Sequence, residues 1–322
     1  MNEKNYTIFQ FFHWYFPPED QLWRKCAEQA SDLEELGVSH VWLPPAYKSA
    51  KGNQETGYAV YDLYDLGEFD QKGSVATKHG TKEEYLLCIQ ETHKRGIKVL
   101  ADVVLNHMFE GDFEEEVPVI EVSSRNRNRS TSPRELIRAK TGFRYPGRAG
   151  KYSDFVWDFS CFTGLMEEGK IKLILNEYTE EGWDHLADKE RGSFDYLMAN
   201  DIEFRNPEVR KELLRWGEWY TKTTSVDGFR IDALKHIPPD FFPQWLDHLS
   251  VVNNRDYFSI GEYWKDGVEK LTHFISLTSR RIRLFDVPLH FNLHRASKEP
   301  GFDLRKVFKG SLVEADPPTI SK

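Results

Sequence analysis

Reactive side chains are most concentrated in the stretch DGFRIDALKHI. It places Arg230, Asp232, Lys235 and His236 within seven positions, at the end of an apolar, strand-like run. A second carboxylate, Glu262, follows Asp232 by 30 residues, about the length of one strand–helix unit. Residues one unit apart occupy equivalent positions on adjacent parallel strands, so we expect the two carboxylates to face each other across a short gap.

A facing pair of carboxylates in an aromatic cleft suits the hydrolysis of glycosidic bonds, in which one group attacks the sugar or activates water and the other protonates the leaving oxygen. Arg230 precedes Asp232 by two residues, so both point to one face of a strand, where the guanidinium would hold Asp232 ionised. Glu262 lies beside Tyr263 and Trp264, where desolvation would raise its pKa, as an acid catalyst requires. The spacing is equally compatible with a structural ion pair inside a barrel.

Strand-like and helical segments alternate along the chain, which predicts a parallel sheet with right-handed crossovers, closed as a barrel or open and doubly wound. In a barrel the C-terminal ends of the strands meet at one mouth, where these side chains would converge. No GxGxxG motif follows the first strand, which argues against a dinucleotide-binding fold. The expected strands are 6–14, 40–45, 98–107, 228–233, 258–264 and 283–289, and the expected helices are 22–37, 82–96, 207–224 and 239–252.

The interval between His107 and Gly228 is too long for one helix and its loops, so it must contain an inserted subdomain. We expect the barrel to begin in residues 1–107, the inserted subdomain to span 108–206, and the barrel to continue through 207–322.

Composition narrows the possible partners. The net charge of -9 and the pI near 5.7 leave no basic surplus for nucleic acid. Aromatic residues make up 14% of the chain, which suits a groove that stacks sugar rings. The chain contains no apolar run of 18 residues, and its first residues lack the apolar core of a signal peptide, so we expect a cytoplasmic protein without a membrane partner. Three scattered cysteines predict buried thiols rather than disulfides.

Three segments, DVVLNH (102–107), GFRIDALKH (228–236) and GEYW (261–264), resemble signature segments of the α-amylase family of glycoside hydrolases. Further segments resemble the bacterial liquefying and cytoplasmic α-amylases, among them WLPPAYK, FDYLM, LFDVPLHFN and GSLVEAD. The resemblance implies a (β/α)8 barrel with an insertion after its third strand. It also implies retaining endo-hydrolysis of α-1,4-glucans such as starch, glycogen or maltodextrin.

The resemblance further implies roles for individual residues. Asp232 would be the nucleophile and Glu262 the general acid, then base. The substrate-binding residues would be Tyr58, His107, Arg230, Lys235 and His236. Judged without the resemblance, His107 is as well explained as a buried, hydrogen-bonded histidine, and Tyr58 as a core residue.

A calcium ion is also implied by the resemblance. Its ligands would be Asn106, Asp195, Asp201 and the main-chain carbonyl of His236, all oxygen donors of the kind that Ca²⁺ prefers. Liquefying members bind additional metals through an acid that matches Asp184 and through an aspartate where this chain has Thr163, which argues against the additional metals.

In the family a third catalytic aspartate follows the seventh barrel strand, whereas this sequence ends in PPTISK shortly after GSLVEAD. We therefore expect about six of the eight strands and no third carboxylate. Two alternatives to hydrolysis stay open: a catalytically defective fragment that binds glucan weakly, and a glucanotransferase, in which a sugar hydroxyl replaces water.

Overall fold

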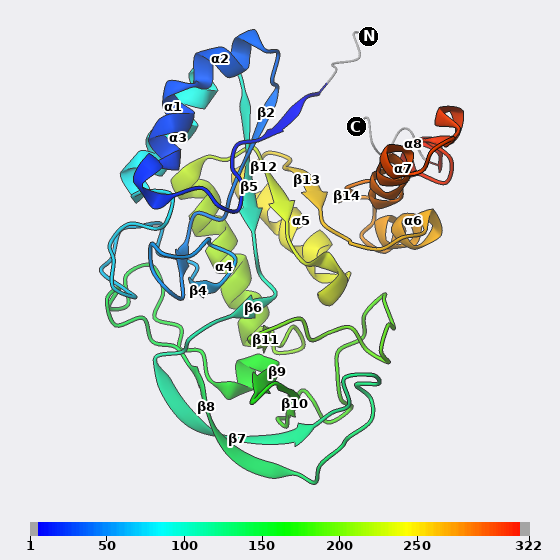
Figure 1. The fold of residues 1–322 in the computed structure, drawn as a ribbon. Helices are drawn as coiled ribbons and strands as arrows, with labels where there is room; N and C mark the ends of the chain where they lie inside the picture. Colours follow the sequence, from blue (N-terminus) through cyan, green and yellow to red (C-terminus); the bar gives the residue numbers. More distant parts are fainter. Residues whose placement is uncertain (1–5, 316–322) are drawn as a thin grey trace.

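The computed structural model describes residues 6–315 of the chain, so the segment PPTISK and the expectation that rests on it lie outside the described residues. Within that range, six strands form a curved parallel sheet in the order β1-β2-β5-β12-β13-β14 (Figure 1). The expected alternation of strands and helices is confirmed. The strands are β1 (Ile8–Gln10), β2 (His40–Leu43), β5 (Lys98–Val103), β12 (Gly228–Ile231), β13 (Phe258–Gly261) and β14 (Arg283–Leu284).

Helices connect these strands and pack beside one another on the outside of the sheet, α1 against α3 and α4 against α5. Capping residues explain where several begin: Thr81 and Glu84 form a capping box at α3, and Asn206 caps α4 ahead of Pro207. The helix expected over 22–37 is divided in two at Gln29. The helices are α1 (Leu22–Glu28), α2 (Ala30–Glu35), α3 (Lys82–Lys94), α4 (Pro207–Thr224), α5 (Phe241–Asn253), α6 (Val268–Leu277), α7 (Val287–Lys298) and α8 (Leu312–Ala315).

A second sheet lies between β5 and α4 in the chain and below the parallel sheet in Figure 1. It is antiparallel, in the order β6-β11-β9-β10-β7-β8, and it occupies most of the expected insertion. The division at 108 and 206 stays a prediction. The strands are β6 (His107–Met108), β7 (Phe113–Glu121), β8 (Glu135–Gly142), β9 (Phe162–Glu167), β10 (Lys170–Ile174) and β11 (Asn200–Ile202).

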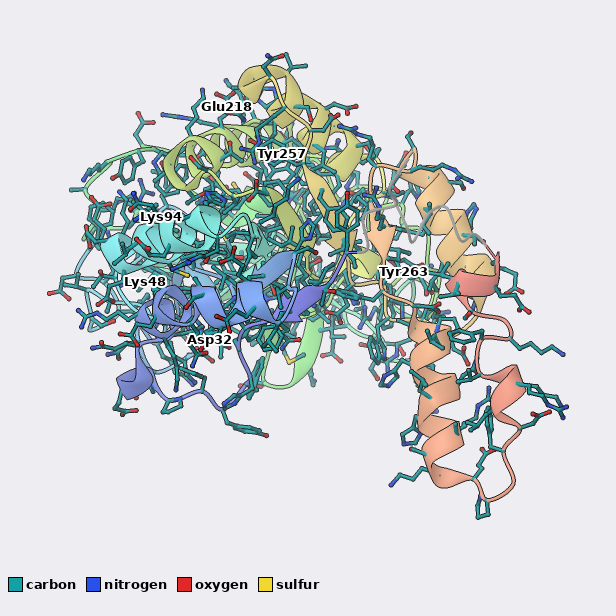
Figure 2. All side chains as sticks on the ribbon, turned by 90° about the horizontal axis from the view of Figure 1, so that it is seen from above. Asp32, Lys48, Lys94, Glu218, Tyr257 and Tyr263 are labelled. Atoms are coloured by element: carbon teal, nitrogen blue, oxygen red, sulfur yellow. The ribbon has the colours of Figure 1, made fainter. Side chains whose placement is uncertain are left out.

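A hydrophobic core fills the space between sheets and helices, with Trp23, Trp216 and Trp245 fully buried. The cysteines Cys26, Cys88 and Cys161 are buried free thiols, as expected. Figure 2 shows α7 extending away from the body of the molecule; the chain then turns back, and α8 packs beside α6. No helix within residues 6–315 is both long and apolar enough to cross a bilayer.

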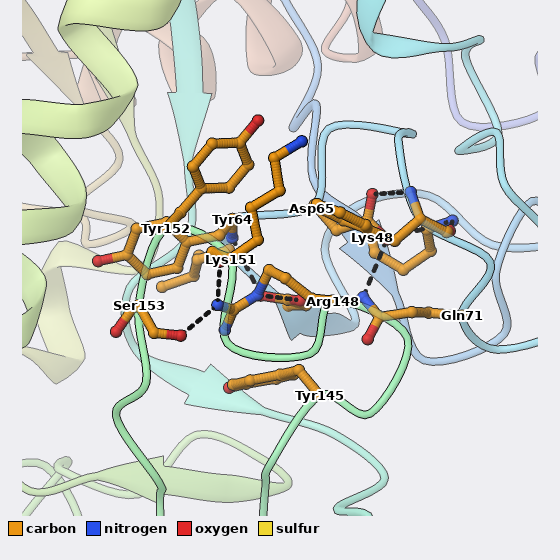
Figure 3. A network of polar contacts seen from close by, with 12 residues as sticks. Lys48, Tyr64, Asp65, Gln71, Tyr145, Arg148, Lys151, Tyr152 and Ser153 are labelled. Carbon is orange, nitrogen blue, oxygen red and sulfur yellow. Dashed lines mark hydrogen bonds and ion pairs between the residues drawn. The ribbon is translucent and has the colours of Figure 1, made fainter.

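A buried polar network joins the hairpin of β3 (Lys48–Ser49) and β4 (Val60–Asp62) to the insertion (Figure 3). Arg148 donates from Nε to Asp62 Oδ2 at 3.0 Å, with side chains 1% and 0% exposed. Gln71 Nε2 donates to Asp62 and Asp65 at 2.9 and 3.0 Å. Because buried charges are stable only when paired, this network holds the hairpin firmly against the insertion.

Candidate active site

The side chain of Arg230 connects three carboxylates on three neighbouring strands. In the register of the parallel sheet, Arg230 lies beside Asp102 of β5 and next to the strand that leads to Glu262. Its Nη1 donates to Asp102 Oδ1 at 3.0 Å and to Asp232 Oδ1 at 2.5 Å, and its Nη2 donates to Glu262 Oε2. The two carboxylates predicted to face each other are therefore held by one guanidinium, whose planar fork suits this geometry.

Asp102 is the residue of this group whose role sequence reasoning missed. It is fully buried and also accepts hydrogen bonds from Trp42 Nε1 at 2.9 Å and from the Tyr58 hydroxyl at 2.7 Å. The guanidinium carbon of Arg230 lies 5.0 Å from the centroid of the Trp42 ring. Asp102 thus fixes the position of Arg230 through a hydrogen bond from the neighbouring strand. The sequence does contain a signal for this role, because Asp102 is a carboxylate inside the apolar run KVLADVV.

Burial controls the protonation of the carboxylates. It raises the pKa of Asp102 to about 6, against the lowering influence of Arg230. Burial likewise raises the pKa of Glu262; Arg230 lowers it, and the negative charge of Asp232 raises it again. Arg230 stays charged, since the nearby carboxylates raise its pKa despite burial. A raised pKa on Glu262 is the property expected of a general acid.

Asp232 and Glu262 open onto a cavity of about 600 Å³, formed by the ends of β1, β2, β12 and β13 together with residues 55–59 and loops of the insertion. A second hollow of about 590 Å³ continues from it toward α7 and shares Trp42, Arg230 and Glu262. The aromatic lining of the first cavity suits a sugar ligand. Its aromatic and polar lining residues include Phe12, Trp14, Trp42, Tyr58, His107, Phe109, Arg230, Asp232 and Glu262.

Tyr58 and His107, both predicted to bind substrate, lie together in this cavity. Trp14 stacks on Tyr58 with ring centroids 5.6 Å apart. His107 Nε2 lies 3.0 Å from the Tyr58 carbonyl oxygen, and Asn106 Nδ2 lies 3.3 Å from His107 Nδ1. Burial lowers the pKa of His107, which favours the neutral ring. Both ring nitrogens are therefore already engaged, and the contact between His107 and a sugar hydroxyl stays a prediction.

Lys235 and His236 lie farther from the carboxylates. Lys235 Nζ binds Glu190 Oε2 at 3.0 Å, and His236 Nδ1 lies 2.6 Å from the carbonyl oxygen of Phe194. Burial lowers the pKa of His236 to about 4. Neither side chain lines the cavity beside Asp232, so their contact with substrate stays a prediction.

Residues 26–299 match the family described as "Alpha amylase, catalytic domain". The chain belongs to the α-amylase family. It is 43% identical over 322 residues to the cytoplasmic alpha-amylase of Escherichia coli, with 98% of this chain and 65% of that protein covered. It is 44% identical over 321 residues to an alpha-amylase of Geobacillus stearothermophilus, covering 98% and 58%.

Solved structures show the fold. An alpha-amylase from Malbranchea cinnamomea matches with a TM-score of 0.58 at 17% identity, covering 95% of this chain and 56% of that one. The parallel sheet is therefore part of a (β/α)8 barrel, which decides between the closed and open sheets that periodicity left undecided. The chain spans less than two thirds of the length of each of these relatives.

The calcium ligands suggested by the α-amylase resemblance lie close together. Asn106 Nδ2 donates to Asp201 Oδ1 at 2.9 Å, while Asn106 Oδ1 is buried without a hydrogen-bond partner. Burial and the neighbouring Asp184 raise the pKa of Asp195 to about 8, and burial and Asp195 raise that of Asp201 well above its usual value. Within residues 6–315, no group of three or more His, Cys, Asp or Glu side chains has metal-binding geometry.

That donor set nevertheless fits Ca²⁺, which accepts amide and main-chain oxygens as well as carboxylates. At the position where the resemblance would place additional metals, Thr163 Oγ1 lies 3.4 Å from Glu203 Oε2. Arg205 holds the same carboxylate through Nε at 2.8 Å and Nη2 at 2.7 Å, and donates to the Gly182 carbonyl at 2.9 Å. A fixed cation therefore already neutralises this carboxylate.

Proposed function

We propose that the protein hydrolyses α-1,4-glucosidic bonds within starch, glycogen or maltodextrin, with retention of anomeric configuration. The observation that carries this proposal is the contact of one guanidinium, that of Arg230, with both Asp232 and Glu262 beside an aromatic cavity. The names of the Escherichia coli and Geobacillus stearothermophilus relatives support it.

The two carboxylates divide the reaction between them. Asp232 attacks the anomeric carbon and forms a glycosyl–enzyme bond, while Glu262 gives its proton to the leaving oxygen as the glycosidic bond breaks. In the second step Glu262 takes a proton from water, and the water oxygen displaces Asp232 from the sugar. The bond of 2.5 Å from Arg230 to Asp232 orients Asp232 and supports its role as the nucleophile, and the raised pKa of Glu262 supports its role as the acid.

Aromatic and polar side chains around the carboxylates would bind the glucan. Tyr58 offers a ring face to the sugar undergoing cleavage, and His107 lies beside it. Lys235 and His236 remain proposed contacts on the leaving-group side. We also propose that the protein acts in the cytoplasm, as the name of the Escherichia coli relative says for that protein.

We further propose that one Ca²⁺ joins the barrel to the insertion. Asn106, Asp195, Asp201 and the main-chain carbonyl of His236 would hold it. The support is the unpaired, buried Oδ1 of Asn106 and a donor set made only of oxygens. The ion would neutralise the buried aspartates and fasten the insertion to the end of β5.

A mechanism-based 2-deoxy-2-fluoro glycosyl inhibitor tests the catalytic assignment. We expect mass spectrometry to find the label on the peptide that contains Asp232, and none in Asp232→Asn. Asp227→Asn is a matched control, because Asp227 begins the same segment but accepts hydrogen bonds from His93 and the Val99 amide, so its labelling should match that of the unmodified protein. Label on another carboxylate, or a product of inverted configuration, would overturn the proposal.

A further inference from the structure

Each of the two catalytic carboxylates is followed, three residues later, by a lysine: Lys235 after Asp232 and Lys265 after Glu262. The two lysines lie beyond the ends of adjacent strands, β12 and β13, and they converge on one carboxylate of the insertion, Glu190. Through these two contacts Glu190 connects the insertion to the ends of both strands.

The contacts form a four-residue cluster, Asp188, Glu190, Lys235 and Lys265, that we name the clamp. Glu190 Oε2 lies 2.5 Å from Lys265 Nζ and 3.0 Å from Lys235 Nζ. Asp188 Oδ2 lies 3.2 Å and 3.7 Å from the same two nitrogens. Two positive and two negative charges are thereby balanced, with the lysine side chains only 18% and 10% exposed. Asp188 is 7% exposed and Glu190 is 39% exposed, so the pairs are only partly screened by solvent.

The clamp and Arg230 hold different parts of the same two strand ends. Arg230 holds Asp232 and Glu262 from within the sheet, whereas the clamp holds the turns that follow them. The same two turns are joined directly, since the Leu234 amide donates to the Glu262 carbonyl at 3.1 Å. No clamp residue lines the cavity beside Asp232.

We propose that Glu190 is a positioning residue, which sets the separation of Asp232 and Glu262 by holding Lys235 and Lys265 together. This inference rests on the proposed function of the carboxylate pair. Glu190 comes from the irregular segment between β10 and β11, so the insertion takes part in aligning the catalytic groups of the barrel. Lys235 is thus given a structural task in addition to its predicted contact with substrate.

Steady-state kinetics on a maltooligosaccharide test the proposal with Glu190→Gln and Lys265→Met. A small displacement of reacting groups acts on kcat, and about 1 Å can cost roughly a hundredfold. We expect each variant to lower kcat by about tenfold to a hundredfold and to leave KM within about threefold. Because both substitutions remove the Glu190–Lys265 contact, the loss of kcat in the double variant should be smaller than the product of the two single losses. Lys265→Arg, which keeps the charge, should restore most of kcat.

Lys270→Gln is the matched control, since Lys270 shares with Glu190 and Lys265 a hollow of about 450 Å³ but has no ion pair with a carboxylate among residues 6–315. It should retain normal kcat. Thermal unfolding of every variant separates a loss of alignment from a loss of folded protein. Unchanged kcat in Glu190→Gln, or independent effects of the two substitutions, would overturn the clamp while Asp232→Asn stays inactive. An active Asp232→Asn would instead overturn the proposed function.

Discussion

Replacing Arg230 with lysine keeps one positive charge in the active site but removes the fork that serves three carboxylates. Arg230 uses Nη1 for Asp102 and Asp232 and Nη2 for Glu262. A lysine ammonium is a single point and cannot occupy both positions. At least one charge-assisted hydrogen bond is therefore lost. We expect it to be the bond to Glu262, because Nη2 makes this bond alone, whereas Nη1 serves both other carboxylates.

The cost follows from the nature of that bond. A hydrogen bond to a charged group contributes about 1.5–3 kcal/mol. Because the bond orients Glu262, the group proposed to move the proton, its loss should appear in the activation barrier, as a fall in kcat of roughly tenfold to a hundredfold. The Arg230 side chain is only 6% exposed, so we expect KM to stay within about threefold.

The pH profile supplies an independent readout. Arg230 lowers the pKa of Glu262, so a weaker contact lets that pKa rise further. A general acid works while protonated, so the limb on which kcat falls with rising pH should move to higher pH in Arg230→Lys. Arg210→Lys, which alters an arginine that binds Asp240 on the outer helices, should change neither kcat nor the limb. An unchanged kcat, or a limb displaced to lower pH, would refute this account of Arg230.

Three further predictions test other parts of the structure. In Asp232→Asn the pKa of Glu262 should fall, because the charge of Asp232 raises it; ¹³C NMR titration of Glu262 measures this, and a rise would contradict it. Chelation by EDTA should speed proteolysis within 108–206 and calcium should reverse this, whereas identical cleavage patterns would argue against the metal. Arg148→Met should lower the free energy of unfolding in urea by about 3–5 kcal/mol, because it removes the ion-pair partner of Asp62 in the core; a loss below about 1 kcal/mol would contradict this.

Periodicity predicted most strands of the parallel sheet, because they are apolar runs buried on both faces. It was wrong over 283–289, where the strand ends at Leu284 and α7 begins at Val287, and it did not predict α6 or α7. The run 40–45 contains β2. The run 98–107 contains β5, which ends at Val103, and its last residue, His107, begins β6 of the other sheet. Periodicity did not show whether the parallel sheet closes into a barrel, since an open and a closed sheet have the same strand pattern along the chain. Nor did it resolve the antiparallel sheet of the insertion, in which β7 and β8 expose polar residues on one face and pair through long-range register.

The site was predictable where spacing along the chain corresponds to neighbouring strands. Asp232 and Glu262 are one strand–helix unit apart, and they do share a contact in Arg230. Asp102 lies 128 residues from Arg230, and only the pairing of β5 with β12 brings the two together. Contacts of this kind depend on strand order and register, which a single sequence does not contain.

The different burial of the three carboxylates explains why one arginine serves all of them. A poorly solvated site with a single cation does not hold three full negative charges, so at least one group retains a proton into a higher pH range. Burial raises the pKa of both Asp102 and Glu262. Asp102 is 0% exposed and so has no route to substrate, whereas the Glu262 side chain is 34% exposed at the cavity. In the proposed reaction Glu262 is therefore the carboxylate whose proton would reach the leaving group, whereas Asp102 orients Arg230 for its other two partners.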